Sequence, residues 1–330
     1  MDIQSAIRRL IQDSPLSREE MRSVMTRIMQ GETTPAQIGG FLVALHLRGE
    51  TLEEVLGAAE ALREMTPALD IPGADLVDTC GTGGDGAHTF NISTASAIVA
   101  AAAGVRIAKH GSRSVSSRSG SADLLEAAGI AIDLDATGVR ESIETVGLGF
   151  LFAPQHHTAM RHVAAPRREL GIRTIFNLLG PLTNPARAQR QVVGIYSQDW
   201  LIPYARILKA LGARHALVLH AEDGLDEISI QAPTHIAEVR DGQIQSRIIT
   251  PEMFGIQRSS LEDLAVDGPM ESLQRIRDLF RGHQGAAFDI VALNAGAAIY
   301  VSGKTQNLES GVEKAQDVLK EGLAERKLEE

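Results

Sequence analysis

The first 66 residues of the chain carry apolar side chains at helical spacing. Three segments begin with a hydroxyl residue followed three positions later by Glu or Gln, the capping box that starts a helix: Ser17–Glu20, Thr34–Gln37 and Thr51–Glu54. Gly31 and Gly49 follow the first two of these segments and are suited to ending a helix. The pattern predicts a small all-helical domain in which the methionines fill the core.

From about Leu76 the pattern changes to short strands that alternate with helices, which is typical of an α/β domain with a mainly parallel central sheet flanked by helices. We predict strands at residues 76–79, 105–108, 149–153, 192–196 and 216–220. Helices are expected at residues 95–103, 122–128, 138–145, 200–211 and 312–323, and further helices near 161–170. Residues 228–250 contain Asp241-Gly242, a hairpin signal, and are expected to extend the sheet with antiparallel strands.

The most informative segment follows the first predicted strand. Gly81, Gly83 and Gly84 allow a tight turn that presents backbone N–H groups to a ligand. Asn91-Ile-Ser-Thr94 then stands at the start of an alanine-rich helix, and a helix N-terminus attracts anions. The spacing fits neither a Walker loop nor the dinucleotide fingerprint. It favours a site for a polyphosphorylated molecule.

A second cluster, Lys109–Ser117, follows the next predicted strand and is therefore expected at the same edge of the sheet. Its lysine, arginine and serines offer positive charge and small donors, which suit a diphosphate. Asp226 and Glu227 follow the strand predicted at 216–220, again at this edge. Such oxygen ligands suit Mg2+, which takes one or two carboxylates together with phosphate oxygens.

Six motifs occur in a fixed order: GTGGD, NIST, KHGSRSVSS, GSADLLE, RRELGIRTIFNLLGPLTNP and DGLDE. Over essentially the whole chain they resemble the anthranilate phosphoribosyltransferase family of tryptophan biosynthesis. The resemblance implies transfer of a phosphoribosyl group from 5-phosphoribosyl 1-diphosphate to anthranilate, with Mg2+ as cofactor. It implies a helical domain at 1–70 joined by helices near 161–185, an α/β domain at 71–330, and an active site in the cleft between them. A homodimer formed through the helical domain is also implied.

The resemblance assigns residues to three sites. For the metal it implies Ser93, Asp226 and Glu227, and for anthranilate Gly81, Ser112 and Arg167. For phosphoribosyl diphosphate it implies Gly81, Gly84, Asp85, Thr89, Asn91, Ile92, Ser93, Thr94, Lys109, His110, Gly111, Ser112, Arg113, Ser114, Val115, Ser116, Ser117 and Ser121. No residue is assigned as a general base, because electrostatics and positioning meet the needs of the reaction, with Lys109 supporting the leaving diphosphate.

Several nearby positions need separate interpretation. A guanidinium can bind a carboxylate through two hydrogen bonds, so an arginine is expected to bind anthranilate. The family motif points to Arg167 for this contact, and Arg168 is expected on the surface. Ser112 stands where the family usually has asparagine, and Thr158 where it usually has proline. A serine is shorter, so its contact with anthranilate is expected to be weaker or carried by water. His110, His156 and His157 are candidates for amine-side contacts, although a structural role is the simpler interpretation of each.

Composition narrows the class of protein. The net charge of −10 and the pI near 5.5 argue against a nucleic-acid binder. The single cysteine, Cys80, excludes an intramolecular disulfide, and we interpret it as a small residue packed under the turn. Residues 1–16 lack the apolar region of a signal peptide, and the apolar stretch 290–301 is short and interrupted by Asn294. We therefore expect a cytoplasmic protein without membrane contact.

Three alternatives stay open on the residues alone. A pyrimidine nucleoside phosphorylase shares the architecture but uses phosphate as nucleophile, and the GTGGD and DGLDE motifs argue against it. A paralogue that binds nucleic acid should show a basic groove and degraded motifs, and neither is visible here. A helical interaction module with an α/β scaffold would have no need of the phosphate motifs.

Overall fold

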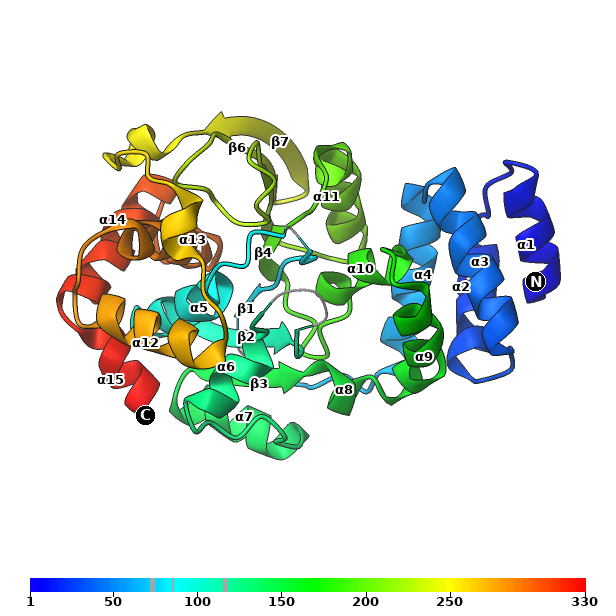
Figure 1. Cartoon of the computed structure of the whole chain (residues 1–330), viewed down its shortest axis with the longest axis horizontal. Helices are drawn as coiled ribbons and strands as arrows, with labels where there is room; N and C mark the ends of the chain where they lie inside the picture. The colour runs from blue at the N-terminus through cyan, green and yellow to red at the C-terminus, as the bar shows by residue number, and fades with distance from the viewer. Residues whose placement is uncertain (72–74, 85, 115–117) are drawn as a thin grey trace. The chain divides into compact units, whose positions relative to one another are not determined.

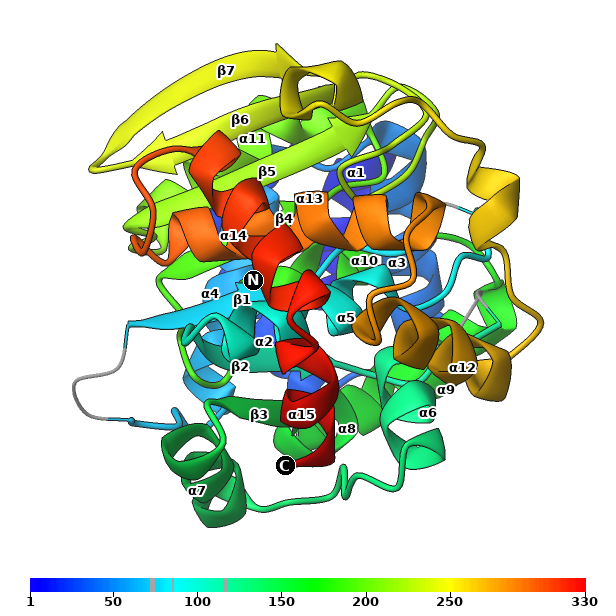
Figure 2. The same cartoon turned by 90° about the vertical axis from the view of Figure 1, so that its left-hand side faces the viewer.

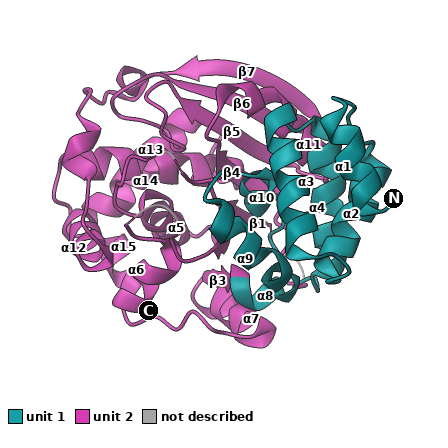
Figure 3. Cartoon of the chain, turned by 45° about the vertical axis from the view of Figure 1, so that its right-hand side comes forward, with its two compact units in different colours: residues 1–68, 154–185 teal, residues 69–153, 186–330 magenta. Residues whose placement is uncertain are grey.

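The computed structural model of the chain describes residues 1–71, 75–84, 86–114 and 118–330. These residues form two compact units, coloured separately in Figure 3. Unit 1 comprises Met1–Ala68 and Pro154–Pro185, and unit 2 comprises Leu69–Ala153 and Ala186–Glu330.

Unit 1 is all-helical, as predicted (Figure 1). The three predicted capping boxes are all formed, and Met21, Met25 and Met29 are buried, which confirms their role as core residues. Helix α1 packs on α3, α2 on α4, and α9 on α3. The helices are α1 Ile3–Ile11, α2 Arg18–Met29, α3 Pro35–Arg48, α4 Leu52–Met65, α8 Ala153–His156, α9 Arg161–Leu170 and α10 Ile175–Leu179, with the 3-10 turns Thr158–Met160 and Gly180–Leu182.

Unit 2 is built on a seven-stranded sheet of order β3-β2-β1-β4-β5-β6-β7, and its mainly parallel character confirms the predicted fold class (Figure 2). The first five strands run parallel, and β6 and β7 are antiparallel. The hairpin turns at Asp241 and Gly242, both with positive φ, as their sequence predicted. The strands are β1 Leu76–Thr79, β2 Arg106–Gly111, β3 Leu148–Phe152, β4 Arg190–Gly194, β5 His215–Ala221, β6 Thr234–Arg240 and β7 Gln243–Ile249.

Alternate residues of the parallel strands face two different cores. Val77 and Ile107 belong to the larger core, which includes buried residues of α5 and α13, whereas their neighbours Leu76 and Ala108 pack in a smaller cluster with residues of α7. A sheet buried on both faces explains why its strands read as nearly continuous apolar runs.

The helices of unit 2 flank this sheet. They are α5 Ile92–Ala102, α6 Ser121–Ala127, α7 Ala136–Thr145, α11 Leu201–Ala210, α12 Pro269–Phe280, α13 Ala286–Val301, α14 Leu308–Lys320 and α15 Leu323–Glu329, with the 3-10 turns Gln198–Trp200, Pro251–Phe254 and Leu261–Leu264. The single helix expected at 312–323 is wrong in its bounds: the chain breaks at Gly322, whose φ of 65° is left-handed, and Leu323 starts a separate helix.

The order of the strands contains a reversal that positions the site. The chain moves from β1 outward through β2 to β3, then returns to β4 on the other side of β1 and continues to β5. In open α/β sheets, ligands bind at the carboxyl ends of the strands beside such a reversal. The glycine loop that follows β1 lies at this point.

Candidate active site

The glycine loop continues the pairing of β1 with β4 beyond the ends of the strands. The N–H of Cys80 donates to the carbonyl of Val192 at 3.2 Å, and that of Thr82 to Gly194 at 2.9 Å. Gly83 and Gly84 then take positive φ angles of 67° and 79° and stay exposed, as the turn prediction required. The backbone is thereby turned toward solvent at the reversal of the sheet.

Asp226 is held against this loop although it lies far away in sequence. Its Oδ2 accepts the N–H of Gly83 at 2.7 Å. A Cβ atom at Gly81 would clash with the same carboxylate, and one at Gly194 would clash with the backbone carbonyl of Asp226. Close approach of backbone therefore requires glycine at 194, and a side chain at 81 would displace the Asp226 carboxylate. The role of Gly194 was missed at the sequence level, although a glycine inside a strand pattern signals such an approach.

Ser93, Lys109 and Glu227 lie around the end of β1. The ammonium of Lys109, only 2 % exposed, donates to the carbonyl of Thr79 at 2.6 Å and to Ser93 Oγ at 3.2 Å. Ser93 and Glu227 line one small cavity together with Thr79 and Gly81. Two of the predicted metal ligands, Ser93 and Glu227, thus meet at one place, and Asp226 contacts the adjoining loop.

The position of Lys109 corrects one prediction. The basic cluster was expected to follow a strand ending at Ala108, but β2 continues to Gly111. Parallel pairing of Lys109 with Phe150 and of Gly111 with Phe152 extends the strand. His110 is buried inside it, and its N–H donates to Asp78 at 3.1 Å, so a structural role of this residue explains its position.

Helix α5 begins directly behind the site, and its first residues are tied to the neighbouring helix. Thr94 Oγ1 donates to Ser121 Oγ at 3.1 Å, which joins the first turns of α5 and α6. Asn91 occupies the N-cap position without capping, because its side chain instead bonds Ser119 and Ser272. The side chains of Ile92 and Thr94 are buried. The anion site predicted at this helix therefore depends on backbone N–H groups and on the side chain of Ser93.

Thr89 lies further along the glycine loop, where it forms an isolated β-bridge with Ala265. Beside it, the N–H of Phe90 donates to the carbonyl of Leu264 at 3.0 Å. These contacts hold the segment that leads into α5.

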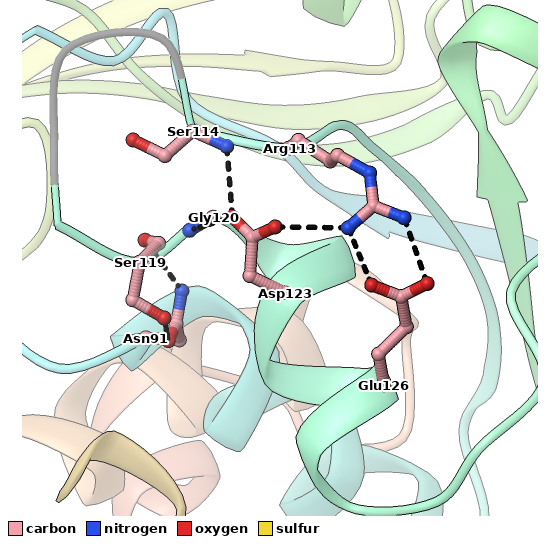
Figure 4. A network of polar contacts seen from close by, with 7 residues as sticks. All are labelled: Asn91, Arg113, Ser114, Ser119, Gly120, Asp123 and Glu126. Carbon is pink, nitrogen blue, oxygen red and sulfur yellow. Dashed lines mark hydrogen bonds and ion pairs between the residues drawn. The ribbon is translucent and has the colours of Figure 1, made fainter. Parts of the chain in front are cut away.

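The described part of the serine loop is held by Asp123 at the start of α6 (Figure 4). One oxygen of Asp123 accepts the N–H groups of Ser114 at 3.0 Å and Gly120 at 2.9 Å, and the other contacts the guanidinium of Arg113. Arg113 also pairs with Glu126, and these two carboxylates raise the pKa of its guanidinium. In this structure Arg113 thus braces α6. Ser112 is exposed at the start of the loop. The predicted site residues Asp85, Val115, Ser116 and Ser117 lie outside the described residues.

Arg167 lies on α9 of unit 1 in a different environment. It is half-buried, its guanidinium lies 5.1 Å from the centre of the Phe176 ring, and burial lowers its pKa. No acidic side chain among the described residues forms a salt bridge with it, whereas its neighbour Arg168 is exposed. The two arginines therefore differ as predicted, and Arg167 keeps a guanidinium available for an anion.

Two histidines of unit 1 differ in the same way. His157 is buried, and its Nδ1 lies 3.0 Å from Thr66 Oγ1, which gives it a structural role. His156 has a buried Nε2 with no hydrogen-bond partner among the described residues, and burial lowers its pKa. Of the three histidines considered from the sequence, His156 is therefore the one with a buried ring nitrogen that lacks a hydrogen-bond partner among the described residues.

Cys80 lies at the end of β1, beside the cavity that Ser93 and Glu227 line. Burial raises the pKa of its thiol, and the neighbouring charge of Asp78 adds to this effect. The thiol is therefore protonated at neutral pH, which fits the packing role predicted for it and gives no support to a nucleophile.

The predicted metal site contains oxygen donors only. Among the described residues, no three His, Cys, Asp or Glu side chains gather into a group that would hold a metal by themselves. Mg2+ seldom uses such a cage, since it keeps several waters and binds one or two carboxylates together with substrate phosphates. The adjacent carboxylates of Asp226 and Glu227 fit that requirement.

In the described parts of the chain, no helix combines the length and apolarity needed to cross a membrane.

Comparison with known protein families identifies the class of enzyme to which the chain belongs. Residues 73–325 match the α/β domain of a glycosyl transferase family, and residues 4–66 match the helical bundle domain of the same family. The chain is therefore a glycosyl transferase with both parts of that architecture.

Individual relatives narrow the class. The anthranilate phosphoribosyltransferases of Alkalilimnicola ehrlichii and Thioalkalivibrio sulfidiphilus are each 55 % identical, over 100 % of this chain and 97 % and 98 % of theirs. The crystal structure of the Thermus thermophilus enzyme matches with a TM-score of 0.92 at 47 % identity, covering 98 % of this chain and 97 % of that one. The structure of the Saccharomyces cerevisiae enzyme in complex with PRPP (phosphoribosyl diphosphate) and Mg matches with a TM-score of 0.89 at 29 % identity. The match covers 99 % of this chain and 96 % of that one. The chain belongs to the anthranilate phosphoribosyltransferase family, and it is a pentosyltransferase.

Proposed function

We propose that unit 2 binds 5-phosphoribosyl 1-diphosphate with Mg2+ and that Arg167 of unit 1 binds the carboxylate of anthranilate. The reaction transfers the 5-phosphoribosyl group to the anthranilate amine and gives N-(5-phosphoribosyl)anthranilate and diphosphate, a step of tryptophan biosynthesis. The family membership supports this reaction over a nucleoside phosphorylase or a nucleic-acid-binding paralogue.

One observation carries the assignment of the diphosphate site. The 2.7 Å hydrogen bond from Gly83 N–H to Asp226 joins the glycine loop after β1 to the acidic pair after β5. Residues separated by more than a hundred positions therefore meet beside the reversal of the sheet, where a ligand is expected. A loop that were merely tight would have no need of the acidic pair.

The chain's own groups supply the positive field for the leaving diphosphate. When bound, Mg2+ neutralises and orients diphosphate charge. Lys109, fixed by Thr79 and Ser93, holds a positive charge at the end of β1. The adjoining N-termini of α5 and α6 add backbone N–H groups and their dipoles. These groups stabilise charge that grows as the bond to the anomeric carbon breaks.

The anthranilate side depends on Arg167. A half-buried guanidinium without an acidic partner is costly to keep charged, and a ligand carboxylate would offset that cost with a two-point contact. Phe176 beneath the guanidinium limits its orientation. The amine of anthranilate loses its proton readily once it is alkylated, so a general base is not required.

We also propose a cytoplasmic homodimer that forms through the helices of unit 1. The most exposed large apolar side chains described in that unit are Ile11 at 73 % on α1 and Leu47 at 80 % on α3, and these two helices pack together. Replacing both residues by glutamate should yield a monomer in light scattering, and a dimer that persists would contradict this interface.

The reaction is tested by the loss of anthranilate fluorescence on mixing with the purified protein, phosphoribosyl diphosphate and Mg2+. The signal should stay constant when any one component is omitted. Loss of phosphoribosyl diphosphate without loss of anthranilate fluorescence would overturn the proposed acceptor.

A further inference from the structure

Asn294 is a polar residue in the middle of α13, within a long buried and mainly apolar run. It is 2 % exposed. A leucine at this position would continue the apolar run and has a higher helix propensity than asparagine. A polar residue that breaks the local pattern inside a core calls for a specific reason.

The Asn294 amide is occupied by one residue of another segment. Its Oδ1 accepts the N–H of Ile228 at 2.8 Å, and its Nδ2 donates to the carbonyl of Ile228 at 3.0 Å and to that of Ile290 at 2.9 Å. Both backbone polar groups of Ile228 are therefore held by a single side chain, much as a neighbouring strand would hold them.

The clamped residue directly follows Glu227. The N–H of Ile228 and the carbonyl of Glu227 belong to the same planar peptide unit, so fixing one fixes the plane of both. Asn294 thus sets the backbone from which the Glu227 side chain extends.

Asn294 also lies beside two of the predicted metal ligands. Asn294, Glu227 and Ser93 line the same cavity, whose volume of about 10 Å³ holds one water molecule at most. A cavity of this size is too small for a substrate. Asn294 therefore borders the same space as two of the predicted metal ligands.

We propose that Asn294 is a positioning residue that holds Glu227 in the orientation required to bind Mg2+ with the substrate diphosphate. The proposal rests on the assignment of Glu227 as a metal ligand in the proposed function. Residues that orient metal ligands typically change metal affinity by 10- to 100-fold when they are replaced.

The test is the Mg2+ concentration that gives half-maximal binding of phosphoribosyl diphosphate, measured by calorimetry on the full chain. Asn294→Leu keeps the branching at Cγ, although its side chain is larger, and removes both hydrogen bonds to Ile228. We expect it to raise this concentration about ten-fold or more, with near-normal binding restored by excess Mg2+. If Asn294→Leu is not folded by circular dichroism, Asn294→Ser removes the same bonds with a smaller side chain and serves in its place.

Tyr300→Phe is the matched control. It removes a buried hydrogen bond from the same helix, that of Tyr300 to Glu238 at 2.6 Å, away from the site. It should lower the melting temperature and leave the Mg2+ midpoint unchanged. If Asn294 had only a structural role, its variants would show this same pattern.

Glu227→Gln separates the proposal from the function on which it rests. A raised midpoint in Glu227→Gln together with normal midpoints in both Asn294 variants would overturn the positioning role alone. A normal midpoint in Glu227→Gln would overturn the metal assignment, and the positioning role with it.

Discussion

Unit 2 contains two clusters of charged groups around a buried residue: one around Glu238 in the antiparallel part of the sheet, and one around Lys109 at the carboxyl ends of the parallel strands. In the first, Glu238 of β6 accepts hydrogen bonds from His215 at 2.8 Å, Tyr300 at 2.6 Å and Arg247 at 2.9 Å. In the second, Asp226 accepts a backbone N–H of the glycine loop, and Lys109 donates to a backbone carbonyl and to Ser93.

The difference lies in what the charges are fastened to. Side chains around Glu238 satisfy one another across three strands and a helix, so this cluster stabilises the fold without needing a ligand. At the carboxyl ends of the parallel strands, the charged side chains mainly form hydrogen bonds with backbone groups. These bonds fix their positions around the glycine loop. Clustered charge alone therefore does not mark a site, and we interpret the charge fixed on a loop at the reversal of the sheet as the ligand-binding cluster.

The largest effect is expected from removing the acidic pair. Asp226→Asn with Glu227→Gln keeps the shapes, and the new amide oxygen at 226 can still accept the Gly83 N–H. Loss of both charges should remove several kcal/mol of transition-state stabilisation and nearly abolish turnover, with the fold retained. Turnover is followed by anthranilate fluorescence at millimolar Mg2+. Wild-type rates in this double variant would show that the pair only supports the loop.

Glu238 should affect stability and leave catalysis unchanged. Burial raises the pKa of Glu238, but the hydrogen bonds from His215 and Tyr300 and the charge of Arg247 outweigh it and lower the pKa to about 2. Because the folded pKa lies below the usual 4.5, the stabilisation is complete above pH 4.5 and is lost as the pH falls toward 2. This amounts to about 3 kcal/mol of unfolding free energy.

Glu238→Gln should lack this acid-dependent part of the stability. Urea unfolding of wild type and variant between pH 7 and pH 3 measures it, and the difference between them should shrink as the pH falls. The Mg2+ midpoint for phosphoribosyl diphosphate should stay normal. A constant difference in stability across this range would contradict the lowered pKa.

A smaller pair of effects separates the two substrates. Lys109→Met should weaken the binding of phosphoribosyl diphosphate and slow turnover, because it removes positive charge near the leaving group. Arg167→Ala should weaken the binding of anthranilate and leave the binding of phosphoribosyl diphosphate, measured by calorimetry, close to wild type. A charge-assisted hydrogen bond contributes about 1.5–3 kcal/mol, so each loss should be roughly 10- to 100-fold.

Arg168→Ala is the matched control for Arg167, since it removes the exposed neighbour on the same helix. It should bind anthranilate as wild type does. Arg167→Lys keeps the charge but not the two-point geometry and should recover only part of the affinity. Equal damage to both substrates by Lys109→Met and Arg167→Ala would show that one of these residues supports the fold and does not contact a ligand.

Most of the fold followed from local patterns. The capping boxes at 17, 34 and 51 and the turn at Asp241-Gly242 encode their structure within a few residues, and all were predicted. The helix expected at 312–323 was misjudged because its apolar stripe continues across Gly322, and a stripe does not reveal where the backbone turns left-handed.

The site was predictable in its motifs and less so in its contacts. The place of Lys109 inside β2 depends on pairing with Phe150 of another strand, which no local signal contains. Gly194 and Asn294 act on residues at 226 and 228, so their roles appear only once the chain has folded. Contacts of this long range are decided by tertiary packing, beyond the reach of propensity and spacing.

The smallest expected effect concerns Ser112, where the family usually has asparagine. Ser112 is exposed, and its backbone carbonyl accepts the N–H of Ala122 at 3.2 Å, so a longer side chain can be added without disturbing packing within unit 2. A neutral hydrogen bond contributes about 0.5–1.5 kcal/mol, so Ser112→Asn should tighten anthranilate by roughly two-fold to ten-fold. Ser112→Ala should weaken it if the serine hydroxyl is a contact. Anthranilate titrations of both variants decide between these roles: an alanine variant that binds as wild type does, beside an asparagine variant that gains nothing, would make residue 112 a plain loop position.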